Sequence, residues 1–287
     1  VGISGTLIIY LVAVLSLLRQ HIPFPTKVKA AKAPRIVWLC WGIVGLLIAV
    51  GIWLAPIHRA WQLSSLGFAA LSQKQPEPFQ TSLEQAHQLA PWEPYYSYQL
   101  GYQLSLNPSN NYPQSEDEKV NGARADRSTE FFKRNVKASP NQESGTSNLG
   151  WQQLFSRQMP QASASFLRST QLIPAKRGVF YSLGQSLFGQ NKEDLGVQAI
   201  ALEIARDPLF LTSPLLRTSE LNSTYPKIQN AVVSLYQQML KAHPQQDSFT
   251  AYLHQCLGGV YWWQGKLTEA EAEFRKNGSS LSQTVLA

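Results

Sequence analysis

The sequence contains little charge and little cysteine. Only 15% of its 287 residues are Asp, Glu, Lys or Arg, whereas soluble domains usually contain about 25%. The two cysteines are Cys40, inside an apolar segment of the kind that enters membranes, and Cys256, far along the polar part of the chain. We therefore predict no disulfide between them, and two cysteines provide no framework for a structural metal site.

Acidic residues are absent from the first quarter of the chain. Glu77 is the first, and seven basic residues precede it. From Glu77 onward there are 18 basic and 18 acidic residues, so the net charge of +7 belongs entirely to the part before Glu77. Because the rest is neutral, its composition does not favour a nucleic-acid partner, which would require clustered Lys and Arg.

Two long segments carry no charge at all, namely residues 1–18 and 36–57. About 20 apolar residues are needed to cross a bilayer as a helix. We therefore predict a transmembrane hairpin over 1–57, with helices at about 1–18 and 36–57. A secretory signal peptide is the alternative for the first segment, but no basic residue precedes it and no small-x-small cleavage site follows it.

The loop between these segments, residues 19–35, contains five basic residues and no acid. Short loops rich in Lys and Arg stay in the cytoplasm, so everything after Ile57 is predicted to be extracytoplasmic. This predicts a multi-pass membrane protein, with the lipid bilayer as its first partner. The alternatives are contact between the loop and anionic lipid, and an inverted topology with a cytoplasmic adaptor.

A regular period runs through the second half of the chain. Prolines recur at a constant interval, as do Leu-Gly pairs and phenylalanines that stand eight residues before a proline. The pattern consists of Pro140, Pro174 and Pro208; Leu149-Gly150 and Leu183-Gly184; and Phe132 and Phe166. It resembles the tetratricopeptide repeat of about 34 residues, in which a glycine of helix A lets a large residue of helix B approach and a proline ends helix B.

The predicted fold is therefore all-α, with two transmembrane helices followed by a tetratricopeptide-type α-solenoid over 77–278. Residues 58–76 are expected to form a helical extension or linker. The expected order is a lone helix B over 77–91, a repeat opening at Pro94 with Leu100-Gly101, a loop insertion over about 107–124, full repeats over 143–176 and 177–210, a degenerate repeat over 211–250, a last repeat with Leu257-Gly258, and a tail over 279–287.

In this repeat family, helix A positions line the inner binding surface. The resemblance assigns that role to aromatic and amide side chains with little charge, which suit a protein partner or a glycan through stacking and hydrogen bonding. The alternative for each is packing between helices. The candidates are Tyr95, Tyr98, Tyr102, Ser147, Trp151, Leu154, Tyr181, Gln185, Phe188, Tyr252, Gln255 and Trp262.

No catalytic constellation is present in the sequence. Its five histidines do not pair with Cys, His or acids at a metal-ligand spacing, and no glycine-rich loop could hold a phosphate. The acidic run over 116–118 is typical of a solvated loop. We therefore expect no metal and no cofactor in this chain.

The N-terminus carries a second resemblance. Gly2-Ile3-Ser4-Gly5, followed by an apolar helix with Tyr10 in its middle, is similar to the end of the O-antigen ligase and polymerase family domain. Bacterial members, notably cyanobacterial ones, continue with one more span and a periplasmic tetratricopeptide tail. The resemblance implies a bacterial inner membrane or a thylakoid membrane as the location, and glycan transfer from a lipid carrier as the activity. The family's functional Arg and His lie upstream, so no catalytic residue carries over.

Two interpretations of the function remain open at this point. Either the chain is the tail of such a ligase and recruits a protein or glycan acceptor for surface-polysaccharide assembly, or it is a non-enzymatic scaffold or accessory subunit of a large, for example photosynthetic, membrane complex. The residues that precede Val1 would distinguish the two.

Overall fold

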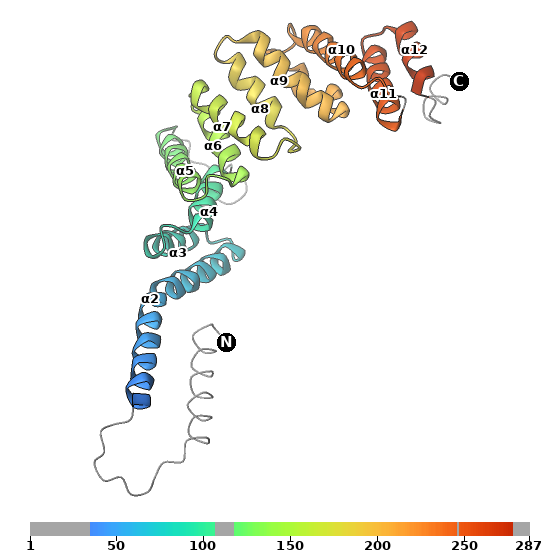
Figure 1. Cartoon of the computed structure of the whole chain (residues 1–287). Coiled ribbons are helices and arrows are strands. Elements are labelled where there is room, and N and C mark those ends of the chain that lie inside the picture. The colour runs from blue at the N-terminus through green and yellow to red at the C-terminus, as the bar shows by residue number, and fades with distance from the viewer. Residues whose placement is uncertain (1–34, 107–117, 246, 278–287) are drawn as a thin grey trace, which may run out of the picture. The chain divides into compact units, whose positions relative to one another are not determined.

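A computed structural model describes residues 35–106, 118–245 and 247–277, and all regular structure in these residues is helical (Figure 1). This confirms the all-α prediction for the described part of the chain. The helices are α2 (Arg35–Ser72), α3 (Pro76–Leu89), α4 (Pro94–Ser105), α5 (Glu118–Ala138), α6 (Glu143–Phe155), α7 (Met159–Leu172), α8 (Val179–Phe188), α9 (Glu193–Arg206), η1 (Pro208–Thr212), η2 (Pro214–Arg217), α10 (Tyr225–Ala242), α11 (Ser248–Trp263) and α12 (Leu267–Asn277).

The chain divides into two compact units, Val1–Trp92 and Glu93–Ala287. In the first unit, α2 is the one helix of the described residues that is long and apolar enough to cross a membrane, with a window of mean hydropathy 1.9. None of its side chains from Trp41 to Arg59 is buried. The predicted span 36–57 lies within α2. The other predicted span, residues 1–18, and the Gly2–Gly5 step lie outside the described residues, so the structure contains one candidate span where the sequence predicts two.

The end of α2 packs against α3 and forms a helix pair with it. A methyl group added at Gly67 would lie 2.9 Å from Leu83 Cδ1, and the rings of Phe68 and Phe79 meet edge to face at 5.3 Å. The predicted lone helix B therefore has a partner, because the predicted linker supplies its helix A. The signal was present in the sequence, since Leu66-Gly67 stands one repeat period before Leu100-Gly101.

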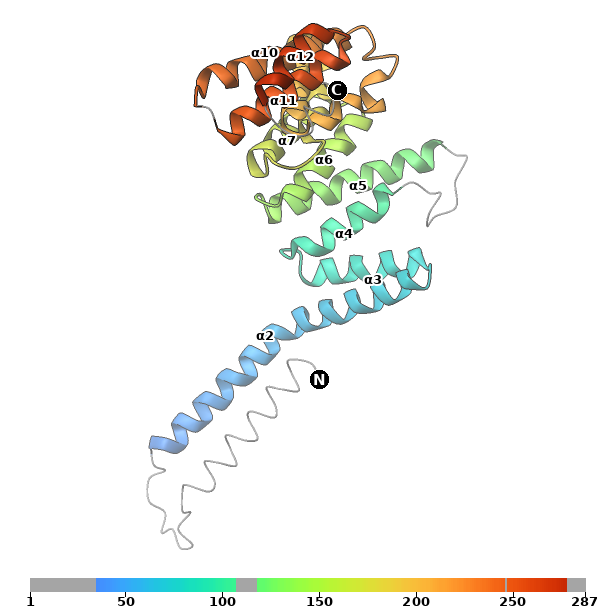
Figure 2. The same cartoon turned by 90° about the vertical axis from the view of Figure 1, so that its right-hand side faces the viewer.

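In the second unit, four more pairs repeat this contact between a glycine of helix A and a large residue of helix B. In each pair, a methyl group added at the glycine would lie very close to the large residue. The shortest distances would be 3.1 Å from Gly101 to Phe132, 2.8 Å from Gly150 to Phe166, 2.6 Å from Gly184 to Ile200 and 2.7 Å from Gly258 to Phe274, each measured from the added methyl carbon. These pairs are α4–α5, α6–α7, α8–α9 and α11–α12, and successive pairs follow one another along the unit (Figures 1 and 2). The described residues thus form an array of helix pairs of the tetratricopeptide type.

The insertion between α4 and α5 is shorter than predicted. Residues 107–117 lie outside the described residues, but α5 already begins at Glu118, so the predicted loop over 118–124 is helical. Arg124 explains the difference, because its Nη2 donates to the carbonyls of Leu104 at 3.2 Å and Leu106 at 2.8 Å and ties the first turns of α5 to the end of α4. The Asn121-Gly122 pair is a common turn signal, but here it lies within the helix.

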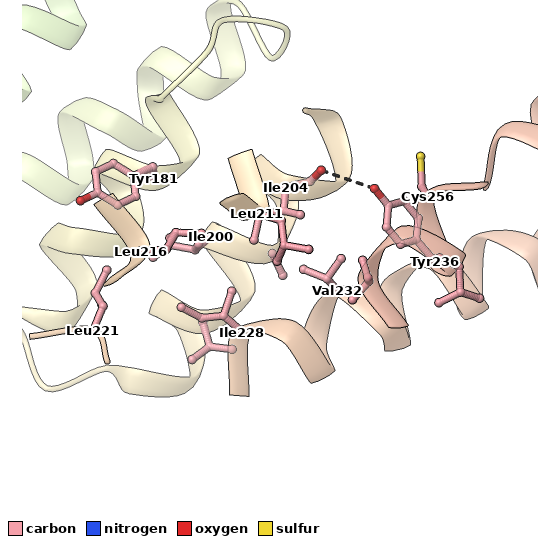
Figure 3. Packing of buried hydrophobic residues seen from close by; sticks show 14 of the residues in the cluster. Tyr181, Ile200, Ile204, Leu211, Leu216, Leu221, Ile228, Val232, Tyr236 and Cys256 are labelled. Atoms are coloured by element: carbon pink, nitrogen blue, oxygen red, sulfur yellow. Dashed lines mark hydrogen bonds between the residues drawn. The ribbon is translucent and has the colours of Figure 1, made fainter. Parts of the chain in front are cut away.

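The degenerate repeat lacks a helix A. The short helices η1 and η2 precede α10, whose Tyr236 is fully buried eight residues before Pro244, like Phe132 and Phe166 before their prolines. Tyr236 lies in the hydrophobic cluster that α9, α10 and α11 share, and its hydroxyl donates to the Ile204 carbonyl at 3.4 Å (Figure 3). Burial raises the pKa of this hydroxyl far above its usual range.

Candidate functional site

The predicted binding residues of α4 divide into packed and exposed side chains. Tyr98 contacts Phe132 of α5 edge to face at 6.0 Å, and its ring stacks on Tyr102 at 6.1 Å with an interplanar angle of 7°. Tyr95 and Tyr102 are both exposed. Tyr98 therefore packs between α4 and α5, whereas Tyr95 and Tyr102 present their rings to solvent.

On α6 the exposed ring is one that the sequence reasoning missed. Trp151 packs edge to face on Phe166 at 5.5 Å and stacks on Phe155 at 5.6 Å. Phe155 is 71% exposed, although it was not among the candidates. The signal was its position four residues after Trp151, which places both on one face of a helix. Ser147 is buried and accepts a hydrogen bond from Lys176 Nζ at 2.9 Å, while Leu154 is half-buried.

The candidates on α8 belong to the core. Tyr181 is buried, meets Phe210 edge to face at 5.4 Å, and accepts a hydrogen bond from Gln185 Nε2 at 2.9 Å. Burial raises the pKa of Tyr181, against the opposing effect of the Gln185 bond. Phe188 packs against the same hydrophobic cluster. Tyr181 and Gln185 therefore satisfy each other, as the packing alternative expects.

On α11, two candidates line a pocket. Tyr252 and Gln255 face a cavity of about 550 Å³ that also involves the end of α9, η1 and the side chains of Leu209 and Trp263. Trp262 is exposed but does not line it, whereas its neighbour Trp263 does. We call this cavity the η1 pocket, because η1 stands where a regular repeat would place helix A and so leaves the space open.

The interior of the η1 pocket combines apolar walls with an available amide. Leu211, Val260 and the ring of Tyr252 are part of its lining, and the side-chain amide of Gln255 makes no hydrogen bond to any residue that the structure describes. Tyr252 is 44% exposed. Its pKa is raised to about 12 by partial burial and by a hydrogen bond with Cys256.

Cys256 at the pocket wall is a structural thiol. It is buried, and desolvation raises its pKa. The neighbouring hydroxyls of Tyr236 and Tyr252 oppose this rise in the pKa without reversing it. Because a nucleophilic cysteine requires a lowered pKa, this thiol is suited to packing and not to reaction.

Trp263 is held in place by a chain of contacts behind the pocket. Its Nε1 donates to the Tyr225 hydroxyl at 2.7 Å, which in turn donates to the Leu211 carbonyl at 3.0 Å. The Arg217 guanidinium lies 5.1 Å from the Trp263 ring centroid, a cation–π distance. The indole wall of the pocket is therefore preorganised before any partner arrives.

The rim of the pocket carries balanced charge. Arg177, whose side chain is 79% exposed, pairs with Asp207 at 3.1 Å, and Arg206 pairs with the buried Glu203. Arg177 reaches this pair from solvent, whereas the side chain of Asp207 is only 17% exposed. Among the described residues no group of His, Cys, Asp or Glu could hold a metal ion.

Similar solved structures are known, but at low similarity. MamA from Desulfovibrio magneticus RS-1 (residues 41 to the end) has 17% identity and a TM-score of 0.43, covering 76% of this chain and 93% of that one. A crystal structure of MamA protein has 13% identity and a TM-score of 0.45, with coverages of 76% and 90%. No protein-family model matches the chain, and no curated protein matches it. Similarity at this level carries no argument about function.

Proposed function

We propose that this chain is a membrane-attached helical-repeat scaffold that binds an extended segment of a protein partner. The observation that carries the proposal is the η1 pocket, which combines a preorganised indole wall with the available amide of Gln255. An extended peptide offers backbone donors and acceptors to an amide and side chains to apolar walls. The site requires no metal, cofactor or reacting group.

Exposed aromatic rings also lie on helix A of the α4–α5 and α6–α7 pairs, in addition to Tyr252 of the pocket. We define the helix-A face as the exposed side chains Tyr95, Tyr102, Phe155 and Tyr252. Aromatic residues are enriched in protein interfaces and supply large contact areas at a low entropic cost. The helix-A face therefore favours a protein partner over a phosphate polymer.

Membrane attachment rests on α2. A free-standing apolar helix exposes its side chains to water at high cost, and lipid around residues 41–57 removes that cost. The side of the membrane on which the repeats lie depends on the basic loop 19–35 and stays a prediction.

The glycan-assembly interpretation depends on residues 1–19, outside the described residues. We retain a glycan acceptor only as an alternative occupant of the stacked Tyr98–Tyr102 and Trp151–Phe155 rings.

Photo-crosslinking in native membranes tests the proposal. A benzophenone amino acid replaces Tyr252 in one variant and Tyr102 in another, with Leu195 of α9 as the matched control because it is 52% exposed but lies outside both the pocket and the helix-A face. We expect discrete protein adducts from Tyr252 and Tyr102 and none of these from Leu195. Adducts that are the same at all three positions, or that contain glycan and no protein, would contradict the proposal.

A further inference from the structure

Helix α2 runs from the apolar span into the first helix pair without a break. Its 38 residues form one α-helix with Pro56 inside. Proline lacks the N–H that would bond to the carbonyl four residues earlier, and this bends a helix without ending it. Figure 1 shows that α2 bends about midway and continues beside α3. No loop therefore separates the candidate span from the first helix pair.

The packing of this pair begins very near the end of the apolar segment. Ile57 is the last residue of that segment, and Ala60, three residues later, is the first fully buried residue of α2 among the described side chains. Three residues of α-helix span about 5 Å. The headgroup layer on each side of a bilayer is about 5–7 Å thick, so the pair begins within this layer if α2 crosses the membrane.

The antiparallel register identifies which end of α3 lies at this level. Gly67 of α2 lies beside Leu83 and Phe79 of α3. Moving back along α2 from Gly67 to Ala60 therefore moves forward along α3 to its C-terminal end, next to the buried Ala90. The chain then continues to Trp92, which belongs to the same compact unit.

Two exposed tryptophans lie at this end of the pair. Trp61 is 59% exposed and Trp92 is 60% exposed, although large aromatic side chains are usually buried. Indole rings favour the boundary between hydrocarbon and water, where the ring meets apolar chains and the N–H meets polar headgroups. The exposed Arg59 adds a cation at the same level, which suits lipid phosphate.

We propose that the end of the first helix pair that carries Arg59, Trp61 and Trp92 lies in the headgroup layer of the bilayer, with a lipid surface as its partner. The inference rests on the membrane attachment in the proposed function and is independent of the η1 pocket. It makes the first helix pair a fixed base on the membrane and not a module on a flexible tether. The α2–α3 turn at Lys74 points away from the bilayer.

Depth-dependent quenching tests this placement in the full chain. Single cysteines replace Val50, Trp61, Trp92 or Lys74 in a Cys40→Ser, Cys256→Ser background and carry a fluorescent label. The protein is reconstituted in phosphatidylcholine–phosphatidylglycerol vesicles that contain either a headgroup quencher or an acyl-chain quencher. Arg59→Cys adds a second probe at the boundary that removes no tryptophan, and circular dichroism checks that each variant is folded.

We expect the labels at positions 59, 61 and 92 to lose fluorescence to the headgroup quencher, the label at 50 to the acyl-chain quencher, and the label at 74 to neither. If position 50 is quenched but 61 and 92 are not, membrane attachment stands and the proposed lipid contact is wrong. If position 50 is not quenched by lipid either, the membrane part of the proposed function fails together with this inference.

Discussion

At the residue scale, the spacing between a helix A glycine and its large partner is nearly constant. Leu83, Phe166, Ile200 and Phe274 each follow their glycine at the same sequence separation, while Phe132 follows Gly101 at a larger one because of the insertion between α4 and α5. At Gly67, Gly150, Gly184 and Gly258 an added methyl group would lie less than 3.0 Å from its neighbour, and at Gly101 it would lie at 3.1 Å. The sequence could predict these contacts because they depend on backbone spacing and not on distant neighbours.

Adjacent glycines of α11 offer a matched test of this contact. A methyl group at Gly258 would lie 2.7 Å from the Phe274 ring, whereas one at Gly259 meets nothing within 4 Å. We expect Gly258→Ala to destabilise the protein by about 1–3 kcal/mol through overpacking. Gly259→Ala should be neutral or stabilising by up to about 1 kcal/mol, since alanine favours helix. Thermal unfolding followed by circular dichroism measures both, and equal effects would contradict the close contact.

A second position of the repeat is buried in three successive helix pairs, but a different type of residue occupies it each time. Asn135, Ser169 and Glu203 recur at the repeat period and are fully buried, and each binds the start of its own helix A. Asn135 donates to the Pro94 carbonyl at 2.8 Å, Ser169 donates to Glu143, and Glu203 accepts from the amides of Gly178 and Phe180. The period predicts where this position falls, but three different side chains hide its common role from the sequence.

Glu203 gives the sharpest prediction at this position. Glu203→Ala removes the acceptor for two amides and the partner of Arg206. Breaking a buried pair on one side is costly, so we expect a loss of about 3 kcal/mol in unfolding free energy. Glu130→Ala, which removes an exposed pair with Arg134, should change it by less than about 0.5 kcal/mol. Urea unfolding compares the two, and similar losses would show that Glu203 is not structural.

At the scale of elements, the start of α11 depends on one carboxylate. Asp247 accepts a hydrogen bond from the Thr250 amide at 2.9 Å and another from His243 Nε2 at 2.9 Å. The Thr250 bond and then the His243 bond lower the pKa of Asp247 from 3.8 to about 2. A carboxyl whose pKa is lower in the folded state stabilises the fold above its unfolded pKa, and this contribution is lost as pH falls through the folded pKa.

The stability difference between the parent and Asp247→Asn should therefore be constant above about pH 4 and shrink as the pH falls to about 2. Thermal unfolding of both proteins across this range measures the difference, which also cancels the titration of other carboxylates. A difference that is the same at both ends of the range would show that Asp247 does not cap α11 as a carboxylate.

The elements that the sequence mispredicted had either no local boundary signal or a misleading one. The helix A of the first pair is continuous with an apolar span, so its Leu66-Gly67 pair looked like part of a linker. The first turns of α5 contain Asn121-Gly122, which usually marks a turn. The η1 pocket arises where the regular helix A is missing. The sequence shows that the repeat pattern is interrupted there, but it does not show which side chains surround the resulting space. Trp263 was overlooked for this reason, whereas Phe155 was overlooked although it lies four residues after Trp151 on one face of α6.

At the scale of the whole molecule, charge is divided between the parts of the chain. The excess of +7 lies before Glu77, and the remainder is neutral. Partner binding by the repeat array should therefore change little between low and physiological ionic strength, because no clustered charge is available to be screened. Titration of the captured partner at several salt concentrations checks this. A steep loss of affinity with salt would assign binding to the basic segment instead.

The central claim is that the η1 pocket holds a segment of a protein partner. The most direct test uses the partner identified by cross-linking, after its purification, and measures its affinity for three variants. Gln255→Ala removes the available amide and Tyr252→Ala removes a wall of the pocket, while Trp262→Ala removes an exposed ring that lies outside it. We predict that the first two weaken binding about tenfold, as residues central to an interface do, with unchanged melting temperatures, and that Trp262→Ala binds like the parent. Equal affinities for all three variants would contradict the claim.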